Sequence, residues 1–178
     1  MKILKKILII VLCLVALPFV VALFIPYKYT VSVTETIHQP RQVVFDYIRM
    51  LKNQKDYSIW VMSDPNMLPV ITGTDGSIGA KQNWNSKLDN VGEGEQEIVA
   101  LTPDRMDVDL RFVRPMKSEA KAANILKSIS ETETQITSEF YSDSKYPMNL
   151  PSYIFGRKYI REAQAQNLKN IKKILEQK

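Results

Sequence analysis

The chain has 178 residues, of which 45% are hydrophobic and 24% are charged, a balance that allows one ordinary globular core. Its net charge of +5 is concentrated at the two ends, in the lysines before residue 7 and the basic residues after 156. Since no aromatic platform is interleaved with these charges, nucleic-acid binding is not expected. With a single cysteine, Cys13, and a single histidine, neither a disulfide nor a metal site is expected.

An uncharged apolar segment runs from Ile7 to Ile25, after Lys2, Lys5 and Lys6. As a helix it would extend roughly 28 Å, close to the thickness of the hydrocarbon core of a bilayer. We expect residues 1–27 to be a transmembrane signal anchor. A cleaved signal peptide is the main alternative, although no small-x-small cleavage site follows the segment. The lysines predict a cytoplasmic N-terminus and place residues 28–178 on the extracytoplasmic side, in the periplasm or at the cell surface.

Apolar and polar residues alternate from Tyr29 to Ile37 and predict a half-buried strand, with Glu35 as the one polar residue on its inner side. Pro40 and the apolar stripe after it predict a helix to Leu51, and a second short helix is expected over residues 53–59. Residues 61–79 are rich in turn-forming residues. They predict a long irregular connection with a short strand at 70–71.

Beyond Gly79, five alternating segments separated by turns predict five strands with antiparallel neighbours. They cover residues 80–86, 93–101, 105–113, 119–129 and 133–141. Small side chains lie on the predicted inner side of these strands, at Ala80, Ala100, Ala120 and Ala122. The acidic side chains of these strands lie on the opposite parity, which predicts a solvated face rather than a catalytic pair or a metal site: Glu93, Glu95, Glu97, Asp107 and Asp109.

The last segment, from Pro151 to Lys178, repeats its apolar residues at close to 3.6 positions and predicts a long amphipathic helix. Its polar face, with Lys169, Lys172 and Lys173, is expected to meet solvent or a membrane. A helix of this length needs a large apolar partner, and the strands supply one. The predicted fold is therefore α+β: a curved antiparallel sheet wrapped around a long C-terminal helix, plus one N-terminal transmembrane helix.

Several local patterns resemble one known superfamily. They are Ile37-His38-Gln39-Pro40 with Val44-Phe45, Gly76-x-x-Gly79-x-x-x-x-Trp84, Phe112-x-x-Pro115, and Leu168-Lys169-x-Ile171-Lys172. In this order they resemble the helix-grip fold of the START-like, or SRPBCC, superfamily. Within it they are most similar to the bacterial branch of polyketide cyclase/dehydrase and lipid transport proteins. The resemblance covers roughly residues 29–176 and implies a START-like helix-grip domain over 28–178, with a cavity for an apolar ligand.

Polar and large side chains on the predicted inner surface are the candidate lining of that cavity. They are Gln82, Trp84, Gln96, Phe112, Asn124, Ser138, Phe140, Ile160, Gln164 and Asn167. A buried polar group without a partner costs about 1–3 kcal/mol, so these groups should bind each other, water or a ligand. His38, at the end of a strand, is expected to lie at the surface rather than to act as a general base.

The sequence therefore predicts a membrane-anchored binding module for an apolar or lipid-like small molecule, with no catalytic residue, no metal and no cofactor. Two alternatives stay open. One is an enzyme of the cyclase or dehydratase type, for which Gln82, Asn124 and Ser138 are poor acid–base groups. The other is an interaction or structural protein with a closed core. The oligomeric state is not predicted.

Overall fold

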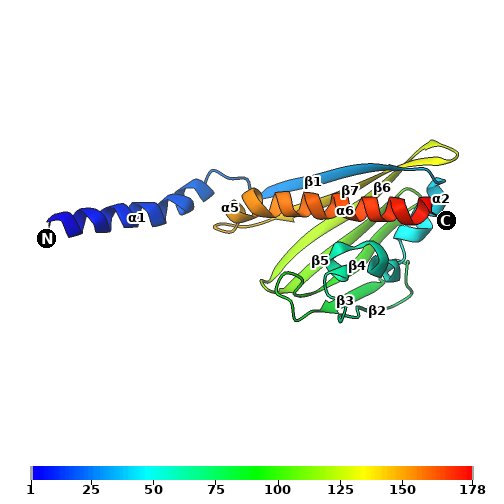
Figure 1. The fold of residues 1–178 in the computed structure, drawn as a ribbon, viewed down its shortest axis with the longest axis horizontal. Coiled ribbons are helices and arrows are strands. Elements are labelled where there is room, and N and C mark those ends of the chain that lie inside the picture. Colours follow the sequence, from blue (N-terminus) through cyan, green and yellow to red (C-terminus); the bar gives the residue numbers. More distant parts are fainter. Residues whose placement is uncertain (1, 178) are drawn as a thin grey trace.

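The computed structural model describes residues 2–177, in which an apolar helix leads into a sheet with one long helix along it (Figure 1). The elements, in chain order, are α1 (Lys2–Ala22), β1 (Lys28–Ile37), α2 (Arg41–Ile48), the 3-10 turn η1 (Leu51–Asn53), α3 (Gln54–Tyr57), α4 (Ile59–Met62), β2 (Val70–Thr72), β3 (Lys81–Asn85), β4 (Glu93–Thr102), β5 (Arg105–Arg114), β6 (Ser118–Ser130), β7 (Glu133–Asp143), α5 (Asn149–Pro151), the π-helical turn η2 (Ser152–Gly156) and α6 (Arg157–Glu176).

The seven strands form one antiparallel sheet in the order β1-β7-β6-β5-β4-β3-β2. Helix α6 runs along β1 and β7 on one face of this sheet, which we call the inner face; the opposite face is the outer face (Figure 1). The end of the sheet next to α1 is called the near end, and the end where β1 stops at Ile37 is called the far end. Together, residues 28–177 are called the α/β unit.

The packed core occupies the far end. Its members come from the far ends of β1, β4, β5, β6 and β7, from Ala80 just before β3, from α2, η1 and α3, and from the second half of α6. They are Ile37, Val44, Phe45, Ile48, Leu51, Tyr57, Ala80, Ile98, Met106, Val108, Leu126, Ile136, Leu168, Ile171 and Leu175. The C-terminal half of α6 therefore closes the far end of the sheet, which confirms the α+β fold predicted from the alternating segments.

The five predicted strands and the short strand near residue 70 are confirmed, and two helical segments differ from prediction. The short helix expected over 53–59 is three pieces, η1, α3 and α4, because extended backbone at Ser58 separates the last two. The long last helix is regular only from Arg157. Before it, α5 and the wider π turn η2 take up residues 149–156.

A β-bulge in β4 changes which of its side chains point inward. The register with β5 shifts between Ile98 and Ala100, so that Leu101 lies opposite the inward Met106 and Ala100 lies opposite the outward Asp107. The prediction that Ala100 is one of the small inner residues is therefore wrong. An extra residue in one strand reverses the side-chain alternation beyond it, and Leu101 packs against the core instead.

Glu35 lies on the inner side of β1, as predicted, and an ion pair with α6 explains its position. The Lys172 Nζ lies 2.9 Å from the Glu35 Oε1, and both side chains are about two-thirds buried or more. The hydrogen bond with Glu35 is the main cause that raises the pKa of Lys172. Lys172 therefore faces β1 rather than solvent or membrane, which corrects the prediction for this lysine.

Gly92 precedes β4 and should not tolerate a side chain. Its φ is +66°, and a Cβ added there would lie 2.1 Å from the carbonyl oxygen of Arg114. We expect Gly92→Ala to lower the free energy of unfolding by about 3 kcal/mol, from left-handed strain and the backbone clash together. Gly79→Ala is the control, because Gly79 has a φ of +86° but nothing within 4 Å of its added Cβ. If urea denaturation shows that Gly92→Ala and Gly79→Ala lose equal free energies of unfolding, the predicted backbone clash at Gly92 is contradicted.

Candidate functional site

The inner face is only partly covered at the near end. Leu110, Phe112, Ala120 and Phe140 all point toward the side on which α6 lies, yet each remains half-buried. The inward residues Ile98, Met106 and Ile136 of the far-end core are buried. Neighbouring strands bring these four positions together, because Leu110 pairs with Ala120 and Phe140 lies opposite Ala122. The near end therefore presents an apolar inner surface that the α6 helix does not seal.

Two of the predicted lining residues, Asn124 and Ser138, border this surface on the side of the core. They are directly paired across β6 and β7 and both are half-buried. Their amide and hydroxyl groups point inward together with Phe140. The register thus brings three of the predicted lining residues side by side on adjacent strands.

Trp84 and Phe112 lie on the other side of the half-buried inner surface, toward β3. Their rings pack edge to face with centroids 5.9 Å apart, and the Trp84 Nε1 donates a hydrogen bond to the Val91 carbonyl oxygen at 3.3 Å. Gly94 on β4 lies between them in the register. A Cβ at Gly94 would come within 2.5 Å of the Trp84 ring, so the missing side chain leaves the space in which this ring lies.

Gln82 and Gln96 hydrogen-bond one another at the edge of the half-buried surface, where Gln96 pairs with Leu110. The Gln96 Nε2 donates to the Gln82 Oε1 at 2.5 Å and to the Gln54 Oε1 at 2.7 Å, and Gln82 and Gln96 are both buried. Their polar atoms therefore already have partners on β3, β4 and α3. This arrangement places them in a structural amide cluster beside the candidate surface.

Helix α6 contributes the remaining three predicted residues. Ile160 is half-buried, and the Asn167 Oδ1 accepts a hydrogen bond from the Ile59 backbone N–H at 2.8 Å, which holds the start of α4. Gln164 is 9% exposed, and its Oε1 has no hydrogen-bond partner among residues 2–177. A buried amide oxygen without a donor costs free energy, so Gln164 is a natural anchor for a ligand's polar group.

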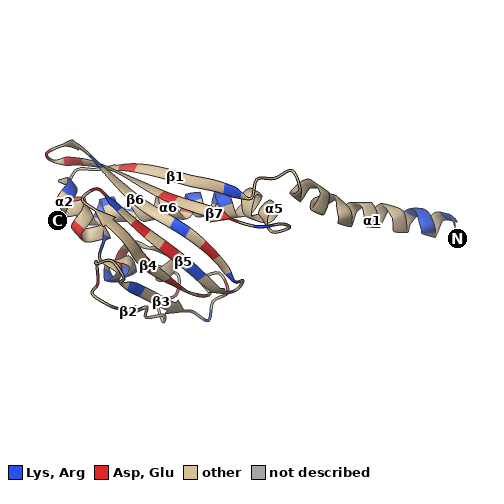
Figure 2. Cartoon of the chain, turned by 180° about the vertical axis from the view of Figure 1, so that it is seen from behind, with Lys and Arg blue, Asp and Glu red and all other residues tan. Residues whose placement is uncertain are grey.

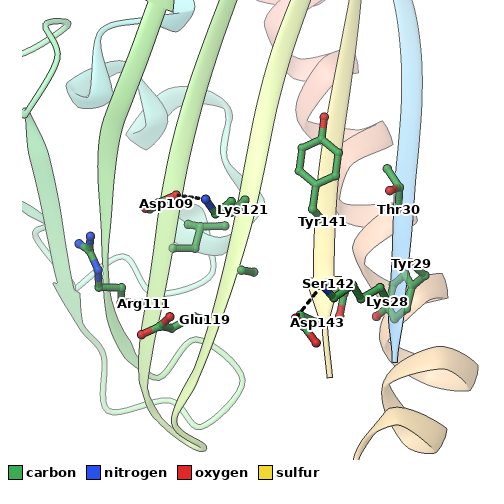
Figure 3. A pocket seen from close by; sticks show the side chains of 12 residues that line it. Lys28, Tyr29, Thr30, Asp109, Arg111, Glu119, Lys121, Tyr141, Ser142 and Asp143 are labelled. Atoms are coloured by element: carbon green, nitrogen blue, oxygen red, sulfur yellow. Dashed lines mark ion pairs between the residues drawn. The ribbon is translucent and has the colours of Figure 1, made fainter. Parts of the chain in front are cut away.

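The outer face has its own hollow, with a volume of about 680 Å³, and Figure 3 shows its lining. Its lining comes from β1, β5, β6 and β7 and includes the inward Leu110, Ala120 and Ser142 as well as outward charged side chains. The outward pairs Lys28–Asp143 and Lys121–Asp109 lie 3.5 and 3.8 Å apart. A second hollow of about 340 Å³ lies at the β5–β6 hairpin. Neither hollow is lined by a residue of α6, so neither lies between the sheet and that helix as the predicted cavity would, although Leu110 and Ala120 border the first hollow and Phe112 borders the second.

Opposite charges alternate along the outer face, as Figure 2 shows. The Arg111 Nη1 donates to Glu95 at 2.6 Å and to Glu97 at 2.9 Å, and the hydrogen bond from Arg111 is the main cause that lowers the pKa of Glu97. The acidic residues expected on this face are therefore held in ion pairs. In residues 2–177, no three His, Cys, Asp or Glu side chains meet in an arrangement that could hold a metal ion.

His38 lies at the far end and is mostly exposed, as expected. Its backbone N–H donates to the Glu176 Oε1 at 2.8 Å, and its Nδ1 lies 2.9 Å from the same oxygen. The backbone hydrogen bond is the main cause that lowers the pKa of the Glu176 carboxyl. These contacts fasten the end of α6 to the end of β1.

This contact predicts a pH-dependent stability. A lowered folded-state pKa stabilises the fold above the unfolded-state pKa of about 4.3, and the stabilisation is lost as the pH falls through the folded-state pKa. We expect Glu176→Gln to lose about 1 kcal/mol of unfolding free energy at neutral pH and to converge with the unchanged chain in acid. Urea denaturation from neutral pH down through the folded-state pKa of Glu176 tests this expectation. Glu162→Gln is the control, because the Glu162 side chain is exposed. A loss independent of pH would contradict the assignment.

Asn149 is a residue that the sequence analysis missed. It is 0% exposed, and its Nδ2 donates to the carbonyl oxygens of Ala22 at 2.7 Å and Ile25 at 2.9 Å. It therefore binds the C-terminal end of α1 to α5. A lone asparagine in a loop carries no local pattern that reveals such a distant contact, so the sequence offered no signal for it.

The fold has relatives among solved structures, although no family model and no curated protein matches the sequence. The crystal structure of Ara h 8.0201 superposes with a TM-score of 0.62 at 12% identity, covering 85% of this chain and 99% of that one. Protein MLL2253 from Mesorhizobium loti gives 0.61 at 14% identity, covering 84% and 98%. DynU16, from the dynemicin biosynthetic locus, gives 0.57 at 12% identity, covering 83% and 47%. The chain thus has a helix-grip fold, and an apolar helix precedes it.

Proposed function

We propose that the chain is a single-pass membrane-anchored binding module that holds an apolar or lipid-like small molecule between the near end of the sheet and α6. The observation that carries this proposal is the half-buried state of Leu110, Phe112, Ala120 and Phe140 on the inner face. Apolar side chains in a core are normally covered, so an apolar inner surface that stays accessible favours a ligand as its cover.

Polar groups beside this surface suit a ligand with a small polar end. Asn124 and Ser138 border it, and the buried Gln164 Oε1 lacks a donor within residues 2–177. A lipid-like molecule has this combination, with a long apolar part and a hydroxyl or amine donor. Acid–base groups for a reaction are not needed for such binding.

Helix α1 supports the assignment of a membrane anchor. It has 21 residues and is apolar enough to cross a membrane, a property that it shares with signal sequences. Its side chains are exposed along its length except for Ala22, which packs against the α/β unit. An exposed apolar helix of this length is stable in a bilayer, which favours retention of α1 as the anchor.

Native mass spectrometry of the full chain, released from detergent micelles in the gas phase, tests the binding. We expect a fraction of the chain to keep one extra mass of lipid size after the micelle is removed. Extraction and chromatography of that mass identify its class. A chain that carries no added mass, whether it is purified from membranes or incubated with mixed lipid extracts, would contradict the proposal.

A further inference from the structure

The join between α1 and the α/β unit is held by hydrogen bonds. Besides the two bonds from Asn149, the Ser144 backbone N–H donates to the Tyr27 carbonyl oxygen at 2.9 Å. Ala22 is 1% exposed at this join. Because the connection is short and bonded on both sides, α1 sets the orientation of the α/β unit instead of acting as a flexible tether.

Apolar side chains are exposed around this join. We call them the near-end patch: Tyr27, Tyr146, Met148, Ile154 and Phe155, each between 42% and 72% exposed. Tyr27 follows α1, Tyr146 and Met148 lie just before α5, and Ile154 and Phe155 lie in η2 just after it. Helix α5 itself contacts α1 (Figure 1). Exposed apolar residues that cluster in this way indicate a contact surface.

The position of the near-end patch indicates which partner covers it. The apolar segment that contains α1 ends at Ile25, just after the helix, and Asn149 binds the Ile25 carbonyl oxygen. The patch therefore lies at the depth where a bilayer crossed by α1 would end. Tyrosines are enriched at this depth because their rings are amphipathic. Lys145 and Lys158 are exposed beside the patch and suit anionic headgroups.

We propose that the near-end patch lies in the headgroup layer of the same membrane that α1 crosses. This inference rests on the proposed function, because it takes α1 as a membrane anchor. The near end of the sheet then faces the bilayer, and the half-buried inner surface at Phe112 and Ala120 is turned toward the lipid. An apolar ligand could pass between the bilayer and the α/β unit without crossing bulk water.

Site-specific fluorescence on the full chain tests the contact. In a Cys13→Ala background, Phe155→Cys carries an environment-sensitive fluorophore, and the chain is reconstituted in vesicles of phosphatidylcholine and phosphatidylglycerol in equal parts. The matched control is Ile129→Cys, since Ile129 is exposed and apolar but lies in the β6–β7 hairpin at the far end. Quenching by iodide in the buffer is compared with quenching by lipids that carry a nitroxide near the headgroup.

The label at position 155 is expected to lose most of its emission to the nitroxide lipids and little to iodide, and the label at 129 should show the reverse. Asn149→Leu removes both hydrogen bonds to α1 and should raise iodide quenching at 155 toward the value at 129. Equal iodide quenching at both positions overturns the proposal. A label at 155 that is shielded from iodide without lipid quenching also overturns it, because a protein partner then covers the patch.

Carbonate extraction of the same vesicles separates this inference from the proposed anchor. If the chain stays in the membrane while the label at 155 remains in water, the near-end patch alone is wrong. If carbonate releases the chain, the anchor fails and the proposed contact fails with it. Retention of the chain together with lipid quenching at 155 supports both.

Discussion

Replacing Ala120 by phenylalanine is expected to weaken binding of the apolar molecule by about tenfold or more, which is at least 1.4 kcal/mol. Ala120 is half-buried on the inner face, between Leu110 on β5 and Ser142 on β7. A phenyl ring there would fill the space that the small side chain leaves on the inner face. The added ring covers the same apolar surface as the ligand, so the ligand loses its contact area.

The effect is measured as the loss of the extra lipid-sized mass in native mass spectrometry, and as a raised Kd for a fluorescent fatty acid. Lys127→Phe is the matched control, because it adds the same ring to β6 at an exposed, outward position. Hydrogen exchange of the α6 amides shows whether α6, on which Trp60 packs through Tyr159 with ring centroids 4.9 Å apart, stays docked in each variant. Equal binding by the two variants would place the ligand elsewhere.

The strands could be predicted because their signal is local. Met106, Val108 and Leu110 alternate with charged residues, and the structure forms β5 over this segment. The long last helix was predicted for the same reason, from its periodic apolar face. A sheet with one apolar face and one long helix leaves few ways to bury both, so the helix-grip arrangement followed from these elements.

The errors come from contacts between distant segments. The bulge that turns Ala100 outward depends on how β4 pairs with β5, and no pattern within β4 reveals it. In the sequence, Lys172 is indistinguishable from the other lysines on the polar face of the helix. In the folded chain, Glu35 of β1 lies 2.9 Å from it. Asn149 acts on carbonyl oxygens more than a hundred residues away in sequence.

The candidate site was predicted only in part. The alternation along a strand predicts which side chains point inward, but it does not predict which of them another element covers. Gln82 and Phe112 both point inward, yet Gln82 is buried in an amide cluster and Phe112 stays half-buried. The difference depends on where α6 crosses the curved sheet. That crossing is set by the packing of the far end, which draws the C-terminal half of α6 onto the core.

Replacing Leu168 by alanine is expected to lower the free energy of unfolding by about 2–5 kcal/mol. Leu168 is 2% exposed and lies in the far-end core together with Ile171 and Leu175 of the same helix. Truncation removes buried methyl groups and leaves a cavity where α6 meets the sheet. Small domains have few kcal/mol in reserve, so this change alone should shift the unfolding midpoint strongly.

Urea denaturation of the full chain in detergent tests this, followed by tryptophan emission, to which both Trp60 on Tyr159 of α6 and Trp84 on Phe112 contribute. The adjacent Lys169→Ala is the control, since Lys169 is exposed and its loss should change the free energy by less than about 0.5 kcal/mol. If α6 closes the fold at its far end and only roofs the near end, Leu168→Ala destabilises strongly, whereas Ile160→Ala, at a half-buried position nearer α1, costs much less. Equal losses at Leu168 and Ile160 would mean that the near end is packed as tightly as the core, which would leave no room there for a ligand.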